Sequence, residues 1–157
     1  KPNLILSFYF RNKIKEELIN LPNCHSINMH PSLLPKYAGC FSNFWNIFNN
    51  EKYTGITYHY LTNKFDAGNI IFQRKIKIHK DDTSFSLHFR LINIAAENLN
   101  NIFKKIFFKP TTGKKQNSKL RTYYGRKLPY GGKPLKHWSK KKKNLFYKAI
   151  YFPPFSF

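Results

Sequence analysis

Three polar side chains form a set that could catalyse acyl transfer. Asn28 and His30 lie two residues apart in the stretch NMHPSLLP, whose prolines and leucines favour a stiff, packed loop, and Asp66 follows 36 positions after His30 in FDAG. A carboxylate near an imidazole holds its tautomer and raises its pKa. An Asn amide can donate to a developing oxyanion. Together they could stabilise a tetrahedral intermediate and move a proton without a nucleophilic Ser or Cys.

Each of these residues also has an ordinary structural interpretation, which its type alone leaves open. A His near a strand end is often a hydrogen-bonded structural residue, and Asn and Asp are common turn and cap formers. Ser32 lacks the G-x-S-x-G elbow of a Ser–His hydrolase. The sequence has no HExxH motif, no paired Cys and no Gly-rich nucleotide loop, and its other histidines lack metal-ligand spacing, so no metal site is predicted.

The elements that must position Asn28 and His30 are a strand, a helix and a second strand. Residues 3–8 are a short apolar run typical of a buried strand, and residues 24–29 form another. Residues 11–21 between them have the pattern of an amphipathic helix. Its apolar face would comprise Ile14, Leu18 and Leu21. This order predicts a βαβ unit with a parallel sheet, and sites form at the carboxyl ends of such strands.

Asp66 is positioned by two further predicted strands. Residues 54–61 and 69–78 are typical of strands, and the loop that carries Asp66 connects them. A helix is predicted ahead of them at 41–52. Its apolar residues at helical spacing are Phe44, Ile47 and Phe48.

A long helix is predicted after the strands, followed by a segment of different character. Asp82 or Thr83 can cap this helix, which would run to about Phe107. Its buried face would comprise Ile92, Ala95, Leu99, Ile102 and Ile106. Beyond it, residues 121–135 are typical of short strands around a Gly-Gly turn, and residues 140–155 of a short helix that stops at a double proline.

Length and composition indicate one domain. The 157 residues, 41% of them hydrophobic, are enough to build a core. No apolar run is long enough to span a bilayer, and the N-terminal apolar run lacks a small-residue cleavage site, so neither a membrane span nor a signal peptide is expected. Cys24 and Cys40 have no CxxC spacing, which favours free thiols in a reducing cytoplasm.

Positive charge is concentrated in the last third of the chain. The formal net charge is +21, and residues 109–157 carry 14 of the 28 Lys and Arg but no acidic residue. Such a tail would attract nucleic acid, an acidic membrane face or a phosphorylated substrate. The abundance of Lys, Asn, Ile, Phe and Tyr throughout is also what an AT-rich genome would produce, so both explanations stay open.

Two motifs make the chain similar to a known family. INMHPSLLPKYAG resembles the signature N-x-H-P-S-L-L-P-x-x-x-G of the folate-dependent formyltransferases. TGITYHYLTNKFDAGNIIFQ resembles their second signature, a D-x-G segment after a G-[VI]-T-x-H strand, at the usual distance. The resemblance implies an α/β, Rossmann-like fold: a parallel-rich sheet flanked by helices, without its first half. Residues 1–108 would be the C-terminal part of the catalytic domain, and 109–157 a basic, aromatic extension with a small β-hairpin and a helix.

The resemblance also implies 10-formyltetrahydrofolate as co-substrate. Asn28 and His30 would steady the oxyanion, and Asp66 would handle the proton beside His30. The pterin would be bound by residues that follow the first strand and by the loop after TGITYHY: Phe10, Arg11, Lys13, Leu18, Leu61, Lys64 and Phe65. For Phe10 and Leu18, core packing is the alternative, because large apolar residues are usually buried.

A narrower resemblance concerns the acceptor amine. KYAGCFSNFWNIFNNEKYTG is similar to the K-Y-R-G…W-x-I…E pattern of the sugar N-formyltransferases, with Ala38 in place of the usual Arg. It implies a nucleotide-linked amino sugar as partner, bound by Lys36, Tyr37, Trp45 and Tyr124. Aromatic residues of the tail could stack on the base or pack with one another. The alternatives are a methionyl-tRNA formyltransferase, with tRNA as partner, and an inactive truncated chain. The assembly is open, with a homodimer as one option.

Overall fold

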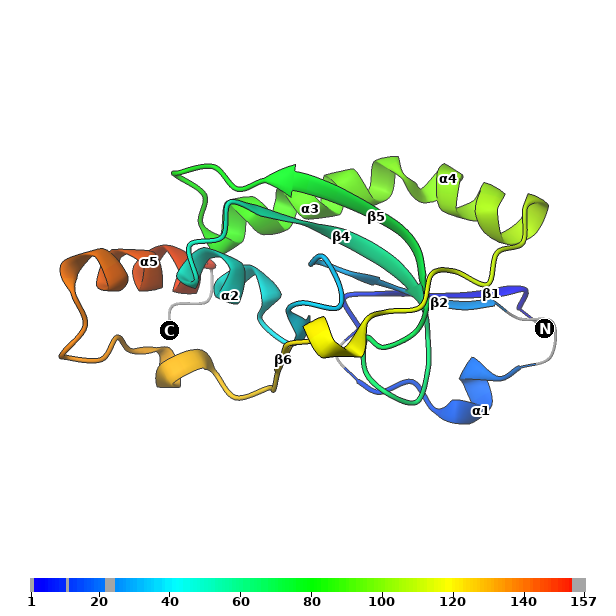
Figure 1. The fold of residues 1–157 in the computed structure, drawn as a ribbon, viewed down its shortest axis with the longest axis horizontal. Coiled ribbons are helices and arrows are strands. Elements are labelled where there is room, and N and C mark those ends of the chain that lie inside the picture. Colours follow the sequence, from blue (N-terminus) through cyan, green and yellow to red (C-terminus); the bar gives the residue numbers. More distant parts are fainter. Residues whose placement is uncertain (1, 11, 22–24, 154–157) are drawn as a thin grey trace.

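The computed structural model describes residues 2–10, 12–21 and 25–153. Across these residues a four-stranded sheet has the order β1-β2-β4-β5 (Figure 1). The strands are β1 (Leu4–Phe8), β2 (His25–His30), β4 (Tyr53–Tyr60) and β5 (Ile70–Lys77). β1 and β2 are parallel, as predicted, but β4 runs antiparallel to both β2 and β5. The α/β class is confirmed, and the sheet is mixed, because β4 alone runs against the direction of β1, β2 and β5.

A run of helix covers one face of the sheet (Figure 1). It comprises α3 (Ser84–Glu97), α4 (Leu99–Phe103) and a π-helical turn, Lys104–Phe108. Thr83 begins it with a capping box, in which Thr83 and Ser86 exchange hydrogen bonds of 3.0 and 3.2 Å. This confirms the predicted start. Of the predicted inner face, Ala95, Ile102 and Ile106 are buried and Ile92 and Leu99 are half-buried.

The helix predicted over residues 11–21 is much shorter than expected. α1 spans Glu16–Ile19 and none of its residues is buried. Leu18 is 47% exposed, so the predicted buried face is wrong. A single helical turn cannot align Leu18 with Ile14 and Leu21, which lie outside it, and so short a helix gains little from its own hydrogen bonds.

Two helices join the tail to the core. α2 (Ser42–Phe48) lies side by side with α5 (Lys140–Ile150), the orange and red helix of Figure 1. The predicted apolar residues of α2 are all buried, as are residues of the tail that pack on them. These core residues are Phe44, Ile47, Phe48, Trp138, Phe146 and Ala149. The tail therefore contributes to the same hydrophobic cluster as the sheet.

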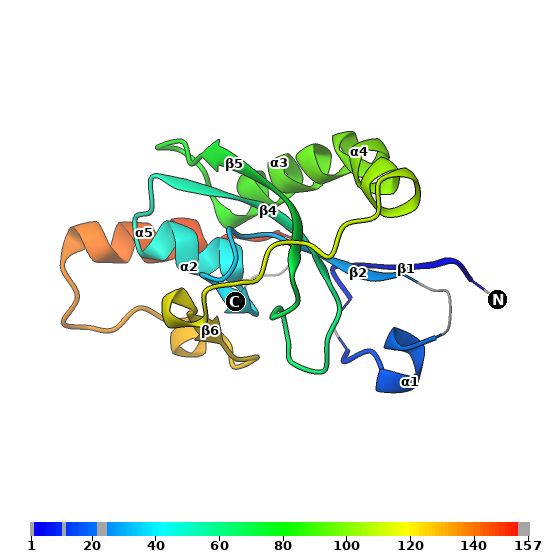
Figure 2. The ribbon, with the colours of Figure 1, turned by 45° about the vertical axis from the view of Figure 1, so that its right-hand side comes forward.

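The segment between α4 and α5 does not form the predicted hairpin. β6 (Tyr123–Tyr124) pairs instead, in parallel, with β3 (Ala38–Gly39), far away in the sequence. The Gly-Gly stretch belongs to a 3-10 turn, Pro129–Gly132, within which Tyr130 has a φ of 52°. On its way to β6 the tail crosses the start of β5, as the yellow segment in Figures 1 and 2 shows.

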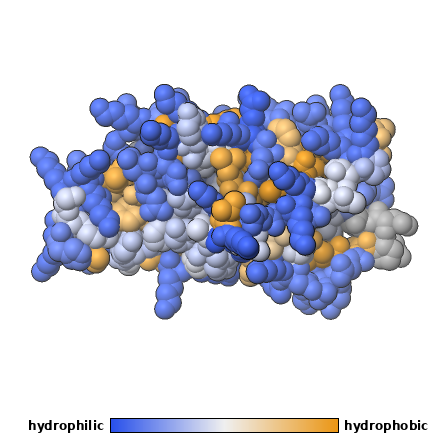
Figure 3. All heavy atoms as spheres, viewed as in Figure 1, coloured by the Kyte–Doolittle hydropathy of each residue, from blue (hydrophilic) through white to orange (hydrophobic). Residues whose placement is uncertain are grey.

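Polar side chains dominate the surface. The face in Figure 3 is largely hydrophilic, with apolar residues gathered in small patches. Among the helices of the described ranges, none combines the length and the apolar character needed to cross a bilayer.

Candidate active site

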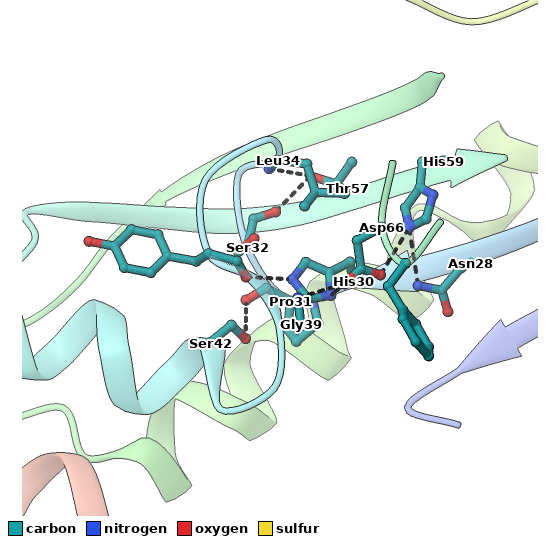
Figure 4. Close-up of polar contacts among 12 residues, drawn as sticks. Asn28, His30, Pro31, Ser32, Leu34, Gly39, Ser42, Thr57, His59 and Asp66 are labelled. Carbon is teal, nitrogen blue, oxygen red and sulfur yellow. Dashed lines mark hydrogen bonds and ion pairs between the residues drawn. The ribbon is translucent and has the colours of Figure 1, made fainter. Parts of the chain in front are cut away.

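The pairing of β2 with β4 brings four polar side chains to one place. Asn28 lies opposite His59, and His30, the last residue of β2, lies opposite Thr57. Asp66, from the loop between β4 and β5, reaches the same point (Figure 4). The predicted trio is therefore brought together, with His59 as a fourth, buried member.

The loop after β2, in the stretch NMHPSLLP, is held in place by hydrogen bonds from neighbouring elements, as its stiff sequence predicts. The buried Thr57 hydroxyl donates to the Ser32 carbonyl at 2.6 Å and accepts from the Leu34 N–H at 3.2 Å. Ser42, at the start of α2, donates to the Pro31 carbonyl at 3.0 Å. These contacts tie the loop to β4 and α2 at once (Figure 4), so the end of β2 has little freedom to drift.

The hydrogen bonds of His30 define which ring nitrogen is available for chemistry. Its Nε2 lies 2.8 Å from the carbonyl oxygen of Tyr37, and because a carbonyl can only accept, Nε2 carries the hydrogen. Nδ1 faces Oδ2 of Asp66 at 3.5 Å. Nδ1 is therefore the atom that can take up a proton, beside a carboxylate that stabilises the resulting imidazolium.

Asp66 is held by its backbone conformation and by a donor from another strand. Its φ is 49°, in the left-handed region, where Asp is one of the few residues tolerated. Oδ2 accepts a 2.7 Å hydrogen bond from the N–H of Gly39, and Oδ1 lies 3.6 Å from Nε2 of His59. The carboxylate thus has a fixed position between two histidines.

Gly39 is required for this arrangement by space and by conformation. Its φ is 88°, and a Cβ there would lie 2.1 Å from the Tyr124 carbonyl oxygen. Glycine alone therefore lets β6 approach β3 closely enough to pair while the Gly39 N–H points at Asp66.

Burial sets the charges of the His30–Asp66 pair. Burial lowers the pKa of His30, although Asp66 opposes the shift. Burial would raise the pKa of Asp66, but the two neighbouring histidines and the hydrogen bond from the Gly39 N–H outweigh it and hold this pKa well below its usual range. At neutral pH the site therefore contains a neutral imidazole and a carboxylate, a pair ready to accept one proton.

His59 is the residue of the site that sequence reasoning missed. Its Nδ1 donates to the Tyr60 carbonyl at 2.8 Å, which leaves Nε2 as an acceptor for the Asn28 Nδ2–H at 3.2 Å. This fixes the Asn28 amide and leaves its second hydrogen available for a bound molecule. Two signals could have indicated it. His59 is the histidine of the G-[VI]-T-x-H motif, and it lies opposite Asn28 in the pairing of β4 with β2.

A pocket opens directly onto these residues. Asn28, His59 and Asp66 line it together with residues of β1, α1 and the β1–α1 and β4–β5 loops. His30 is buried and is not among the lining residues; it lies beside Asp66, which is. Among the pterin-binding predictions, the lining residues are Phe10, Lys13, Leu61, Lys64 and Phe65. Leu18 is absent from the lining, which contains Ile14 and Ile19 instead, and Arg11 lies outside the described residues. Phe10 is 59% exposed, which contradicts the alternative that it packs in the core.

The predicted acceptor-binding residues gather on the other side of the site. Tyr37 is buried, and its hydroxyl donates to Glu51 at 2.7 Å. The ring of Tyr124 stacks on Trp45 at 4.2 Å and on Tyr37 at 5.9 Å between centroids, while Lys36 is exposed. Tyr124 of the tail therefore packs on Trp45 and Tyr37 of the catalytic part.

Within the described part of the chain, no group of three or more His, Cys, Asp and Glu side chains could hold a metal ion. The site offers an amide donor and a carboxylate that line a pocket, with an imidazole beside the carboxylate.

Comparisons with known proteins agree with these features. The family model described as formyl transferase matches residues 1–101. GDP-perosamine N-formyltransferase of Brucella melitensis is 38% identical over 154 residues, which cover 98% of this chain and 59% of the relative.

Solved structures share the fold. That of WlaRD, described as a sugar 3N-formyl transferase in the presence of dTDP and 5-N-formyl-THF, is 29% identical with a TM-score of 0.79, covering 96% of this chain and 56% of that one. An N-formyltransferase from Helicobacter canadensis, in complex with folinic acid and dTDP-3-aminofucose, is 29% identical with a TM-score of 0.71, covering 83% and 49%. The chain thus spans less than two thirds of the length of each of these relatives.

Proposed function

Because the chain belongs to the formyl transferase family, we propose that it transfers a formyl group from 10-formyltetrahydrofolate to the amine of a nucleotide-linked amino sugar. The observation that carries this proposal is that Asn28, His59 and Asp66 line the pocket, with His30 directly behind Asp66. An amide donor and a proton acceptor side by side are what acyl transfer to an amine requires.

The pocket suits the pterin end of the folate. Phe10 and Phe65 present exposed aromatic rings, 59% and 44% accessible, where a flat heterocycle could pack. The polar lining side chains and the backbone of the 61–66 loop offer donors and acceptors for its edge. We propose that Phe10, Lys13, Leu61, Lys64 and Phe65 hold the folate, which supplies the formyl group when bound.

The side chains then have separate tasks. The free hydrogen of the Asn28 amide would donate to the formyl oxygen as negative charge develops on it. As the new bond forms between the amine nitrogen and the formyl carbon, His30 Nδ1 would accept a proton from the amine, with Asp66 stabilising the positive imidazole. The same proton then passes to the departing folate nitrogen as its bond to the formyl carbon breaks.

The acceptor class is supported by the names of the relatives. GDP-perosamine N-formyltransferase and WlaRD both act on amino sugars according to their descriptions, and the WlaRD structure was obtained with dTDP. Lys36 and the basic tail supply positive charge that a diphosphate would attract. We propose a cytoplasmic setting, because the two cysteines of the sequence lack CxxC spacing, which favours free thiols in a reducing compartment.

The test is release of tetrahydrofolate, followed by absorbance, from 10-formyltetrahydrofolate with GDP-, dTDP- and UDP-linked amino sugars. Release with one sugar that is lost in His30→Ala would support the proposal. Release that depends on tRNA and on no sugar would refute the acceptor, and release that persists in His30→Ala would refute the mechanism.

A further inference from the structure

Two side chains of the tail donate hydrogen bonds to the backbone of the loop that carries Asp66. Gln116 donates from Nε2 to the carbonyl oxygens of Asp66 at 3.0 Å and Gly68 at 2.7 Å. The guanidinium of Arg121 donates from Nη1 to the Asp66 carbonyl at 3.1 Å and from Nη2 to the Phe65 carbonyl at 2.7 Å. Three carbonyls within four residues are thereby held from outside the loop.

The tail that supplies these donors is itself anchored at both ends. Before Gln116, the backbone of Lys114 exchanges two 2.8 Å hydrogen bonds with Ile70 of β5. After Arg121, the Thr122 carbonyl accepts from the Ala38 N–H at 2.9 Å, where β6 joins β3. The segment that carries Gln116 and Arg121 is therefore held in place at both of its ends.

These hydrogen bonds can hold Asp66 in place because its backbone is not in its preferred conformation. A φ of 49° is tolerated better by Asp than by most residues but is still less favourable than the right-handed region, and such a conformation persists where its surroundings impose it. The carboxylate reaches the Gly39 N–H and His30 from this backbone position. If the Asp66 carbonyl were released, the loop could relax and the carboxylate would leave His30.

We propose that Gln116 and Arg121 are positioning residues, which fix the Asp66 backbone so that its carboxylate faces His30. The proposal deepens the catalytic role of Asp66 and to that extent rests on the proposed function. It makes a part of the chain outside both sequence motifs necessary for the geometry of the site. Arg121 donates two hydrogen bonds in a fork that Lys cannot reproduce. Arg121→Lys should therefore displace the Asp66 carboxylate as Arg121→Met does.

The first test is amide hydrogen exchange in the whole chain, which needs no activity. The Gly39 N–H is protected by Asp66, whereas the Ala38 and Cys40 N–H groups are protected by the carbonyls of Thr122, just before β6, and of Tyr124 in β6. In Arg121→Met, exchange at Gly39 should become ~10-fold faster or more while Ala38 and Cys40 stay protected. Unchanged protection at Gly39 would overturn the proposal, and so would loss at all three amides, which would show that Arg121 merely holds β6. Lys115→Met, an exposed change in the same segment, is the control.

The second test measures turnover and separates the two proposals. Arg121→Met and Gln116→Met should lower kcat by ~10-fold or more with little change in the KM for the folate, since a displaced carboxylate affects the reaction more than binding. In an Asp66→Asn background the same substitutions should have no further effect, because they act through Asp66. Additive losses would overturn the positioning role. If the unaltered chain transfers no formyl group, the proposed function fails, and the exchange result still decides the positioning role.

Discussion

Replacing Gly39 with alanine should damage stability and catalysis together. The added Cβ would lie 2.1 Å from the Tyr124 carbonyl oxygen and 2.9 Å from a ring carbon of Tyr123. Backbone cannot give way as a flexible side chain can, so β6 must move off β3. The move breaks the 2.9 and 2.8 Å hydrogen bonds of the Ala38 and Cys40 N–H groups, each contributing about 1 kcal/mol.

The backbone conformation adds to this effect. Alanine at a φ of 88° costs roughly 1–2 kcal/mol relative to its preferred region. Gly39→Ala should therefore lower the free energy of unfolding by about 3–4 kcal/mol in total, which corresponds to a Tm about 6–16 °C lower for a chain of this size. Turnover should fall as well, because the donor to Asp66 moves with the strand.

Thermal unfolding followed by circular dichroism measures the change. The matched control is Gly125→Ala in the same segment, since nothing lies within 4 Å of a Cβ built there; it should melt within about 1–2 °C of the unaltered chain. A Gly39→Ala variant that melts like this control would refute the reasoning, because β6 would then not depend on close approach at Gly39.

Three further substitutions test other parts of the structure. His59→Leu removes the acceptor that orients the Asn28 amide and should lower kcat ~10-fold or more, whereas the exposed His79→Leu should not; equal kinetics would exclude an orienting role. Because the pKa of Asp66 is depressed in the folded chain, the stability from its ionised form is complete above about pH 5 and is lost as pH falls below ~4 toward the folded pKa. Urea unfolding should therefore show a steeper loss from pH 6 to 3 than in Asp66→Asn, and parallel profiles would contradict this. Phe146→Ala, at a fully buried position, should lower the free energy of unfolding by ~3–5 kcal/mol; an effect as small as that of Tyr147→Ala, 56% exposed, would mean that α5 is not part of the core.

The parts of the fold that follow from local pattern were predictable. Apolar runs located β1 and β2, and helical spacing located α2 and the cap of α3 at Thr83. These elements depend on neighbours in sequence or on one βαβ connection, and periodicity reports both. The convergence of Asp66 with Asn28 and His30 was implied by the resemblance to the formyltransferase signatures, not by periodicity.

Features decided by distant partners were not predictable in the same way. Periodicity does not report strand direction, so the antiparallel placement of β4 went unseen. The apolar spacing at 11–21 favoured a helix, but Leu18 is 47% exposed in the structure. The partner of β6 lies in β3, and the Tyr37 N–H donates to Thr122, 85 residues away. For the same reason no local signal marked Gln116 or Arg121, whose partners lie across the fold.

The pairing of β3 with β6 has a consequence for the order in which the protein acquires its site during synthesis. Asn28, His30, His59 and Asp66 all leave the ribosome before the segment that completes their geometry. Chains fold from the N-terminus as they emerge, yet a nascent chain that ends before Tyr124 lacks the strand that lies against Gly39. Formyl transfer, on the proposed function, should therefore begin only after translation has passed residue 124, whatever has folded before it.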